Sequence, residues 1–132
     1  MTKILDAHAL LVFLERELGF EKVKAIFSGE VEKDKRLLMT SVNFGEVFYI
    51  VLRDVGEEKA LEIEKTIHSL PIEIINVDIQ IAKEAVHFKS RGKMSYADCF
   101  VAALAKIHKG EIITGDKEFK AVESEVKISW IT

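Results

Sequence analysis

Acidic residues stand at two notable places in the segment MSYADCFVAALAKIHKGEIITGDKEF. Asp98 lies near the start of a largely apolar, helix-like stretch, and Asp116 follows a short apolar run. Two further acids have a comparable setting: Asp6 ends the first apolar run of the chain, and Glu46 lies among the apolar residues of TSVNFGEV. These four carboxylates are the first candidates for chemistry.

Carboxylates that converge on one point repel one another and lose hydration, so a converging set is costly unless a cation compensates. Mg²⁺ and Mn²⁺ are hard ions that prefer oxygen ligands and keep positions open for water and phosphate oxygens. Such an ion can lower the pKa of a bound water, hold it in line with a phosphorus atom and stabilise the departing oxygen. The acids therefore point to a divalent-metal site, and phosphodiester hydrolysis is the chemistry such a site performs.

Most of these acids also have a simpler interpretation as helix caps. Aspartate and serine are favoured at helix N-termini, and the helix dipole favours an acid in the first turn. This interpretation fits Asp6, Asp78 and Asp116. It also fits Asp98, because Ser95-x-x-Asp98 is close to a capping box. For any one of these residues alone, capping is a sufficient explanation.

Glu46 is harder to explain as a cap, because it lies more than one turn inside its predicted helix. Its neighbour Gly45 occupies a position where glycine costs about 1 kcal/mol relative to alanine. We interpret Gly45 as a point of close approach by another backbone, with Glu46 directed at a site.

Strand-like and helix-like segments alternate along the chain. The predicted strands are Lys3–Asp6, Arg36–Thr40, Ile72–Val77, Glu111–Thr114 and Lys127–Ile131. The predicted helices are Ala7–Leu18, Phe20–Ser28, Val42–Val55, Glu57–Leu70, Asp78–Arg91 and Ser95–Lys109, with a solvated loop at Glu30–Arg36. This order predicts an α/β fold: one domain, residues 1–132, built as a three-layer α/β/α sandwich around a mainly parallel sheet. In such sheets ligands bind at the carboxyl ends of the strands, where the acids are expected.

The composition is that of a folded protein, with 48% hydrophobic and 31% charged residues. No apolar run is long enough to span a bilayer, and no signal-peptide pattern is present. We therefore expect a cytoplasmic protein that does not associate with a membrane. The single cysteine, Cys99, cannot form an internal disulfide, and no Cys/His cluster has zinc spacing. A formal net charge of −3 argues against indiscriminate coating of nucleic acid but leaves room for a local basic patch.

Taken in order along the chain, the four acids resemble the acidic quartet of PIN-domain nucleases. They stand in ILDAHALL, TSVNFGEV, SYADCFVAALA and ITGDKEF, and TGDKEF is the most distinctive of these motifs. Size and spacing are similar to the VapC-type toxin ribonucleases of toxin–antitoxin systems. The resemblance implies a PIN-like fold and a metal-dependent endoribonuclease, in which Asp6, Glu46, Asp98 and Asp116 are catalytic and hold one or two Mg²⁺ or Mn²⁺ ions.

The resemblance also implies supporting roles. Thr114 is expected to orient the site by hydrogen bonding, and Asn43 is expected to lie in its wall. Asp78 has no place in the family's motif and remains a cap. Family members commonly carry a hydroxyl residue within the two positions after the first acid, whereas this chain has Ala7 and His8 there. One interpretation of His8 is a hydrogen bond to a metal-bound water or a substrate phosphate, and we favour the other, a packed or solvated side chain on an early helical turn.

Positive charge brackets the acids in the sequence. Lys89, Arg91 and Lys93 precede the Asp98 helix, and Lys117 follows Asp116. Any one of these residues is as well explained as ordinary solvated surface, but the pattern as a whole favours a polyanionic substrate. The resemblance implies RNA that is cut in single-stranded or loop regions, where bases are accessible.

The helix predicted at Val42–Val55 is apolar on more than one face, since Phe44, Phe48 and Ile50 join its core residues. A two-sided apolar helix in a small domain favours a homodimer or higher homo-oligomer, and a well-covered core helix is the equal alternative. VapC-type proteins usually dimerise and are held inactive by a cognate antitoxin. The resemblance therefore implies a second copy and an antitoxin as partners.

Two other metal-using α/β classes lack their required acids here. A receiver domain needs an acidic pair after its first strand, and a haloacid-dehalogenase-type phosphatase needs an acid two residues after Asp6, where His8 stands. The open alternative is a catalytically weak PIN-like module for RNA binding or protein interaction. Four costly carboxylates argue against that alternative, and the departure at His8 argues slightly for it.

Overall fold

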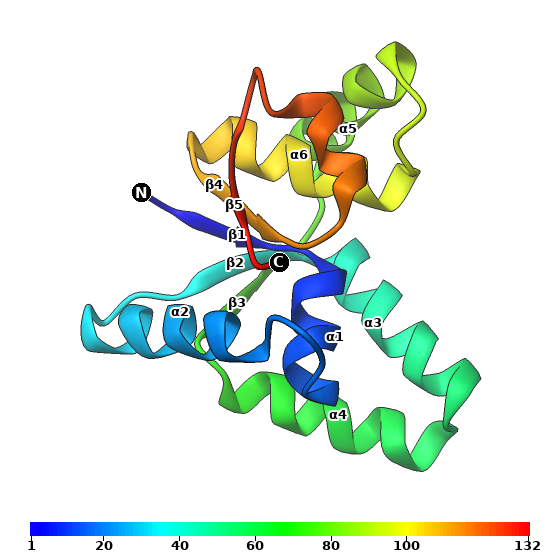
Figure 1. Cartoon of the computed structure of the whole chain (residues 1–132). Helices are drawn as coiled ribbons and strands as arrows, with labels where there is room; N and C mark the ends of the chain where they lie inside the picture. The colour runs from blue at the N-terminus through cyan, green and yellow to red at the C-terminus, as the bar shows by residue number, and fades with distance from the viewer.

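Five parallel strands form the central sheet of the protein, whose computed structural model describes residues 1–132 (Figure 1). The strands are β1 (Lys3–Leu5), β2 (Leu37–Thr40), β3 (Ile72–Ile75), β4 (Glu111–Thr114) and β5 (Lys127–Trp130). Their order is β3-β2-β1-β4-β5, so β1 lies in the middle and the chain crosses over the sheet between neighbouring strands. All carboxyl ends therefore meet at one edge, as the sequence predicts.

Helices cover both faces of this sheet (Figure 1). They are α1 (Ala7–Glu15), α2 (Phe20–Glu32), α3 (Ser41–Asp54), α4 (Glu57–Ser69), α5 (Ile79–Arg91) and α6 (Tyr96–His108), with a 3₁₀ helix η1 at Lys117–Val122. One buried apolar cluster joins the sheet to α1, α2, α3 and α4, and a second joins it to α5, α6 and η1. The predicted three-layer α/β/α class is confirmed. No helix combines the length and the apolar character needed to span a bilayer.

Two predicted boundaries are wrong on the α1–α2 side. Helix α1 ends at Glu15, three residues before the predicted end, because Arg16 adopts a left-handed conformation with φ 53°. Helix α2 continues to Glu32, so the predicted loop at Glu30–Arg36 begins inside a helix. Glu30 is only 3% exposed, because it forms an ion pair of 2.8 Å with Lys3 of β1. The charge that suggested a solvated loop is paired by a residue distant in sequence.

Side-chain caps fix the points where strands turn into helices. Asp6 accepts a hydrogen bond from the Ala9 N–H at 2.7 Å and starts α1. Asp78 does the same for α5 through the Ile81 N–H at 2.9 Å. These caps satisfy backbone donors that a helix N-terminus leaves free. The capping interpretation of both aspartates is correct, and it positions their carboxylates firmly at the carboxyl edge of the sheet.

Candidate functional site

Asp6 stands at the centre of the carboxyl edge, after β1, and is 1% exposed. One of its oxygens accepts from Ala9, and the other accepts from the Thr114 hydroxyl at the end of β4. The same hydroxyl oxygen accepts from the Asp116 N–H at 2.9 Å. Thr114 thus connects Asp6 to the loop that carries Asp116.

Asp98 enters the same edge from the first turn of α6 and is 8% exposed. Its backbone N–H donates to the Ser95 hydroxyl at 3.3 Å, but its carboxylate makes no hydrogen bond or ion pair within the protein. Asn43 braces this turn from α3: it is fully buried, its amide donates to the Ala97 oxygen at 3.0 Å, and its oxygen accepts from the Thr40 hydroxyl. Asn43 therefore holds the N-termini of α3 and α6 together.

Glu46 approaches from the second turn of α3, and its Oε1 atom is buried without a hydrogen-bond partner. Its neighbour Gly45 is exposed, and an added Cβ there would meet no atom within 4 Å. The prediction that another backbone packs against Gly45 is therefore wrong. The direction of Glu46 comes from its place on the inner face of α3, and the glycine has no packing role there.

Glu118 completes the acidic group, although no motif in the sequence had marked it as a candidate. One oxygen each from Asp98, Asp116 and Glu118 lie within 4.8 Å of one another. The Glu118 carboxylate also accepts a hydrogen bond from the Ser95 N–H, so it links η1 to the start of α6. Its position two residues after Asp116 in TGDKEF is the only signal in the sequence, and that signal has meaning only once the segment is known to be a 3₁₀ turn capped by Asp116.

We define the acidic cluster as Asp6, Glu46, Asp98, Asp116 and Glu118, and burial is the largest cause of the pKa shifts of Asp6, Glu46 and Asp98. It raises the pKa of Asp6 to about 7 and the pKa of Asp98 to about 8, and the neighbouring Asp116 carboxylate adds to both shifts. Burial also raises the pKa of Glu46, although the Asn43 side chain opposes the shift. No lysine or arginine forms an ion pair with any of the five acids. The cluster therefore favours any ligand that brings positive charge.

The donor set fits a hard divalent cation. Every candidate ligand atom is a carboxylate oxygen, and Mg²⁺ binds such oxygens at about 2.1 Å. A small inward movement of Asp98, Asp116 and Glu118 would bring one oxygen of each within that distance of a common ion. No sulfur or imidazole belongs to the cluster, which argues against zinc or copper.

Two of the four predicted substrate-binding cations are engaged in local structure. The Lys89 ammonium donates to the Met94 oxygen at 2.9 Å, and Arg91 forms an ion pair of 3.0 Å with Glu125. Lys93 is exposed in the loop before α6 and makes no side-chain hydrogen bond or ion pair. This group of residues is thus held mainly by its own neighbours.

Lys117 is the predicted cation that stays close to the acids, since it directly follows Asp116. Its ammonium lies 4.6 Å from the centre of the Trp130 ring and 3.4 Å from the Thr132 oxygen. His8 is exposed and borders the same loop: a Cβ added to Gly115 would stand 2.7 Å from His8 Cε1. A larger residue at position 115 would therefore have to displace the His8 ring, and His8 lies at the rim of the acidic cluster.

The remaining predicted residue, Asp78, lies apart from the cluster. It follows β3 at the outer position of the sheet, with β2 between that strand and the central β1. It is exposed, and its carboxylate does not perturb the pKa of any clustered acid.

Comparison with known proteins identifies the family of this chain. A family model described as the PIN domain matches residues 3–125. VapC ribonuclease Mb0640 of Mycobacterium bovis is 25% identical over 124 residues, which cover 89% of this chain and 92% of that protein. Two solved structures share the fold. DNA-bound VapBC from Salmonella typhimurium has a TM-score of 0.76 at 16% identity, covering 100% of this chain and 99% of that one. VapC20 from Mycobacterium tuberculosis, a sarcin-ricin loop cleaving toxin, has a TM-score of 0.74 at 13% identity. The match covers 92% of this chain and 95% of that one. Because the family match spans nearly the whole chain and every strand of the sheet but β5, this protein belongs to the PIN-domain family.

Proposed function

We propose that this protein is a Mg²⁺- or Mn²⁺-dependent endoribonuclease that hydrolyses phosphodiester bonds of RNA at the acidic cluster. The observation that carries the proposal is Asp98: the residue is 8% exposed, and its carboxylate has no partner within the protein and lies beside other acids. A buried carboxylate without a partner is destabilising, so its surroundings are better explained by a bound cation than by folding. The similarity to VapC ribonucleases supports RNA as the substrate.

Asp98, Asp116 and Glu118 would hold the cation, with Asp6 and Glu46 completing the charge around it. When bound, the ion would lower the pKa of a water and polarise the scissile phosphate. Thr114 keeps the Asp6 carboxylate turned toward the site, and its link to the Asp116 N–H holds the β4 loop. Burial and neighbouring acids raise the pKa values of Asp6 and Asp98 to about 7 and about 8, and a bound cation would lower both and so favour the ionised carboxylates.

We also propose that the protein is the toxin of a toxin–antitoxin pair and forms a homodimer. Several fold neighbours are VapBC complexes, which supports an antitoxin partner. Large apolar side chains on α3, on α4 and in the turn between them are exposed in the single chain, among them Tyr49, Leu52, Val55 and Leu61. An apolar surface of this kind supports burial against a protein partner.

The test is cleavage of a mixed pool of structured and single-stranded RNAs by the purified protein in Mg²⁺, in Mn²⁺ and in EDTA. We expect metal-dependent cutting that falls on the order of a thousandfold in Asp98→Asn, because that variant removes a ligand and a charge from the site. Asp78→Asn is the matched control, since Asp78 is also a helix cap after a strand but lies outside the cluster. It should cut at the wild-type rate.

The alternative, a PIN-like module that binds without cutting, has one feature in its favour, the replacement of the family's common hydroxyl residue by His8. This alternative predicts that the protein binds RNA but does not cut it with any metal, and that the binding survives Asp98→Asn. Such a result from folded protein free of antitoxin would overturn the nuclease proposal.

A further inference from the structure

Residues 130–132 lie directly beside the loop that carries Asp116. Trp130 pairs in register with Thr114, and the Ile131 N–H donates to the Thr114 oxygen at 3.0 Å. An added Cβ on Gly115 would stand 3.1 Å from Ile131 Cγ1. Because β4 and β5 are parallel, the last strand ends beside the end of β4, at the carboxyl edge of the sheet (Figure 1). Trp130, its final residue, therefore lies at the same edge as the acidic cluster.

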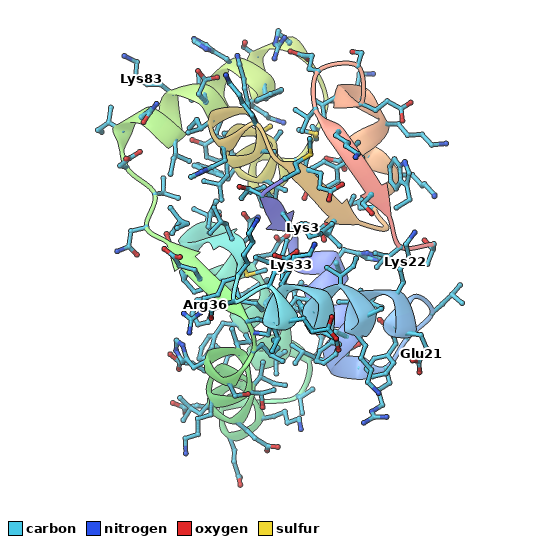
Figure 2. All side chains as sticks on the ribbon, turned by 90° about the vertical axis from the view of Figure 1, so that its left-hand side faces the viewer. Lys3, Glu21, Lys22, Lys33, Arg36 and Lys83 are labelled. Atoms are coloured by element: carbon cyan, nitrogen blue, oxygen red, sulfur yellow. The ribbon has the colours of Figure 1, made fainter.

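Two lysines from distant parts of the chain converge on these residues. Lys117, on η1, lies over the Trp130 ring and also donates to the Thr132 oxygen. Lys22, on α2, donates to the main-chain oxygen of Trp130 across 108 residues of sequence. Figure 2 shows Lys22 beside the end of the last strand, whereas Lys83 projects from a far corner of the molecule. The fold therefore gathers positive charge next to the acids.

No aspartate or glutamate side chain neutralises these two lysines. Neither ammonium has such a carboxylate within ion-pair distance, in contrast to Arg91 with Glu125. Carbonyl oxygens and an aromatic face are weaker partners for an ammonium than a phosphate, since the phosphate carries a full negative charge. An arriving phosphate can therefore take the lysines from their resting contacts.

Moving Lys117 would uncover the indole. Trp130 is partly exposed in the resting structure, and the Lys117 ammonium covers one face of its ring. A planar apolar ring beside free cations matches the two parts of a nucleotide, a base that stacks and a phosphate that needs charge. An apolar peptide would leave both lysines uncompensated, so it fits this surface less well.

We infer that Trp130, Lys117 and Lys22 form a binding site for one nucleotide of single-stranded RNA next to the cutting site. The base stacks on the indole that Lys117 uncovers, while Lys117 and Lys22 contact the adjoining phosphates. This inference rests on the proposed function, because it takes RNA as the substrate. It replaces the group formed by Lys89, Arg91 and Lys93 as the main substrate contact.

Trp130 is the only tryptophan of the chain, so its fluorescence reports on this site alone. A short single-stranded RNA is titrated in Mg²⁺ buffer into Asp98→Asn, which should bind without cutting. We expect a saturable change in tryptophan emission and a loss of affinity of about tenfold or more in Trp130→Leu on that background, the range that one stacked base contributes. Trp130→Phe retains a ring and should lose less.

The lysines are tested by salt dependence. Each of Lys22→Gln and Lys117→Gln should weaken binding several-fold and reduce the slope of log affinity against log salt by about 0.7, the contribution of one phosphate contact on a single strand. Lys24→Gln is the matched control, because Lys24 is an exposed lysine of the same helix and makes no side-chain hydrogen bond or ion pair. It should leave affinity and slope unchanged.

The possible failures are distinguishable. RNA that binds with no change in Trp130 emission, and with equal affinity for the leucine and glutamine variants, would overturn the inference while the nuclease proposal stands. An absence of both RNA binding and metal-dependent cleavage would overturn both. If thermal melting shows that Trp130→Leu is unfolded, two other measurements still test the inference. These are the tryptophan emission of protein that retains Trp130 and the affinities of Lys22→Gln and Lys117→Gln.

Discussion

The two edges of the central sheet differ in whether their acidic side chains form ion pairs with lysine. At the amino edge, Glu30 is 3% exposed and pairs with Lys3 at 2.8 Å. Glu111 lies between Lys3 at 3.6 Å and Lys127 at 3.7 Å, so each carboxylate there has a cation. At the carboxyl edge, no lysine or arginine forms an ion pair with the acidic cluster, and the Asp98 carboxylate makes no hydrogen bond or ion pair within the protein. One sheet thus carries a compensated and an uncompensated set of carboxylates.

This difference separates stability from function. The chain is able to place a lysine beside a buried glutamate, as Lys3 shows, and the hydrogen bond that Lys3 donates to Glu30 raises the pKa of the lysine. The absence of any such residue at the carboxyl edge leaves a site that attracts external cations. Charges that only stabilise a fold are paired internally, whereas charges that bind a ligand remain free for it.

The largest effect on stability should come from breaking the compensated edge. Lys3→Met leaves the buried Glu30 carboxylate unpaired and should lower the free energy of unfolding by about 3 kcal/mol, measured by urea denaturation. Lys127→Met is the control: it removes a cation from the same edge, but that lysine is mostly exposed and its pair should contribute less than about 1 kcal/mol. Equal losses in the two variants would contradict the comparison.

A divalent cation should stabilise the uncompensated edge. Mg²⁺ or Mn²⁺ at about 100 times its dissociation constant should raise the free energy of unfolding by about 2.7 kcal/mol, because it binds the folded cluster and not the unfolded chain. Thermal melting with and without EDTA measures this. Asp98→Asn should lose most of this metal-dependent stabilisation. If Asp98→Asn keeps the full shift in melting temperature, the ion binds elsewhere.

The stability of the metal-free protein should fall as pH rises, because the pKa values of two buried carboxyls are raised. Asp6 and Asp98 titrate at about 7 and about 8 when folded, above their values in the unfolded chain, so the folded state binds more protons. Stability in EDTA should therefore fall as pH rises from 5 to beyond 8. Asp98→Asn should flatten this fall and be more stable than the wild type by about 2 kcal/mol at the alkaline end, with no advantage near pH 4. Denaturation curves across the range check it, and a wild type that gains stability with pH would refute it.

The smallest effect concerns the glycines at the two ends of β4. A Cβ at Gly110 would stand 2.5 Å from the Thr2 backbone oxygen, whereas one at Gly115 would meet the exposed His8 ring at 2.7 Å. Gly110→Ala should therefore cost about 1 kcal/mol more than Gly115→Ala, since backbone yields less than a side chain. Adding His8→Ala should rescue Gly115→Ala alone. Urea denaturation of the set measures the difference, and rescue of both glycine variants would show that His8 is not the obstacle.

Much of the fold and part of the site follow from local sequence patterns. Strand β4 has the predicted bounds, and helix α6 differs from its prediction by one residue at each end. The aspartates at strand ends cap their helices, and their convergence follows from the parallel sheet that the alternating segments predict. The structure brings the four acids of the quartet near one another, and their catalytic role stays a prediction. The predicted packing role of Gly45 failed because helix periodicity says which face a residue occupies but not what lies opposite.

What the sequence by itself determined are features that depend on neighbouring residues: the apolar periodicity of each helix, its caps and the placement of an acid after each of several strands. What only the tertiary structure decided are contacts between distant segments. Glu118 of η1 lies beside Asp98 of α6 although strand β4 separates the two helices in the chain, Glu30 pairs with Lys3, and Lys22 contacts Trp130 across 108 residues. Capping and periodicity act within one or two turns of the chain, so the sequence displays them directly. Whether a charge is paired, free or poised beside an aromatic ring depends on which segments the fold brings together, and no local pattern encodes that choice.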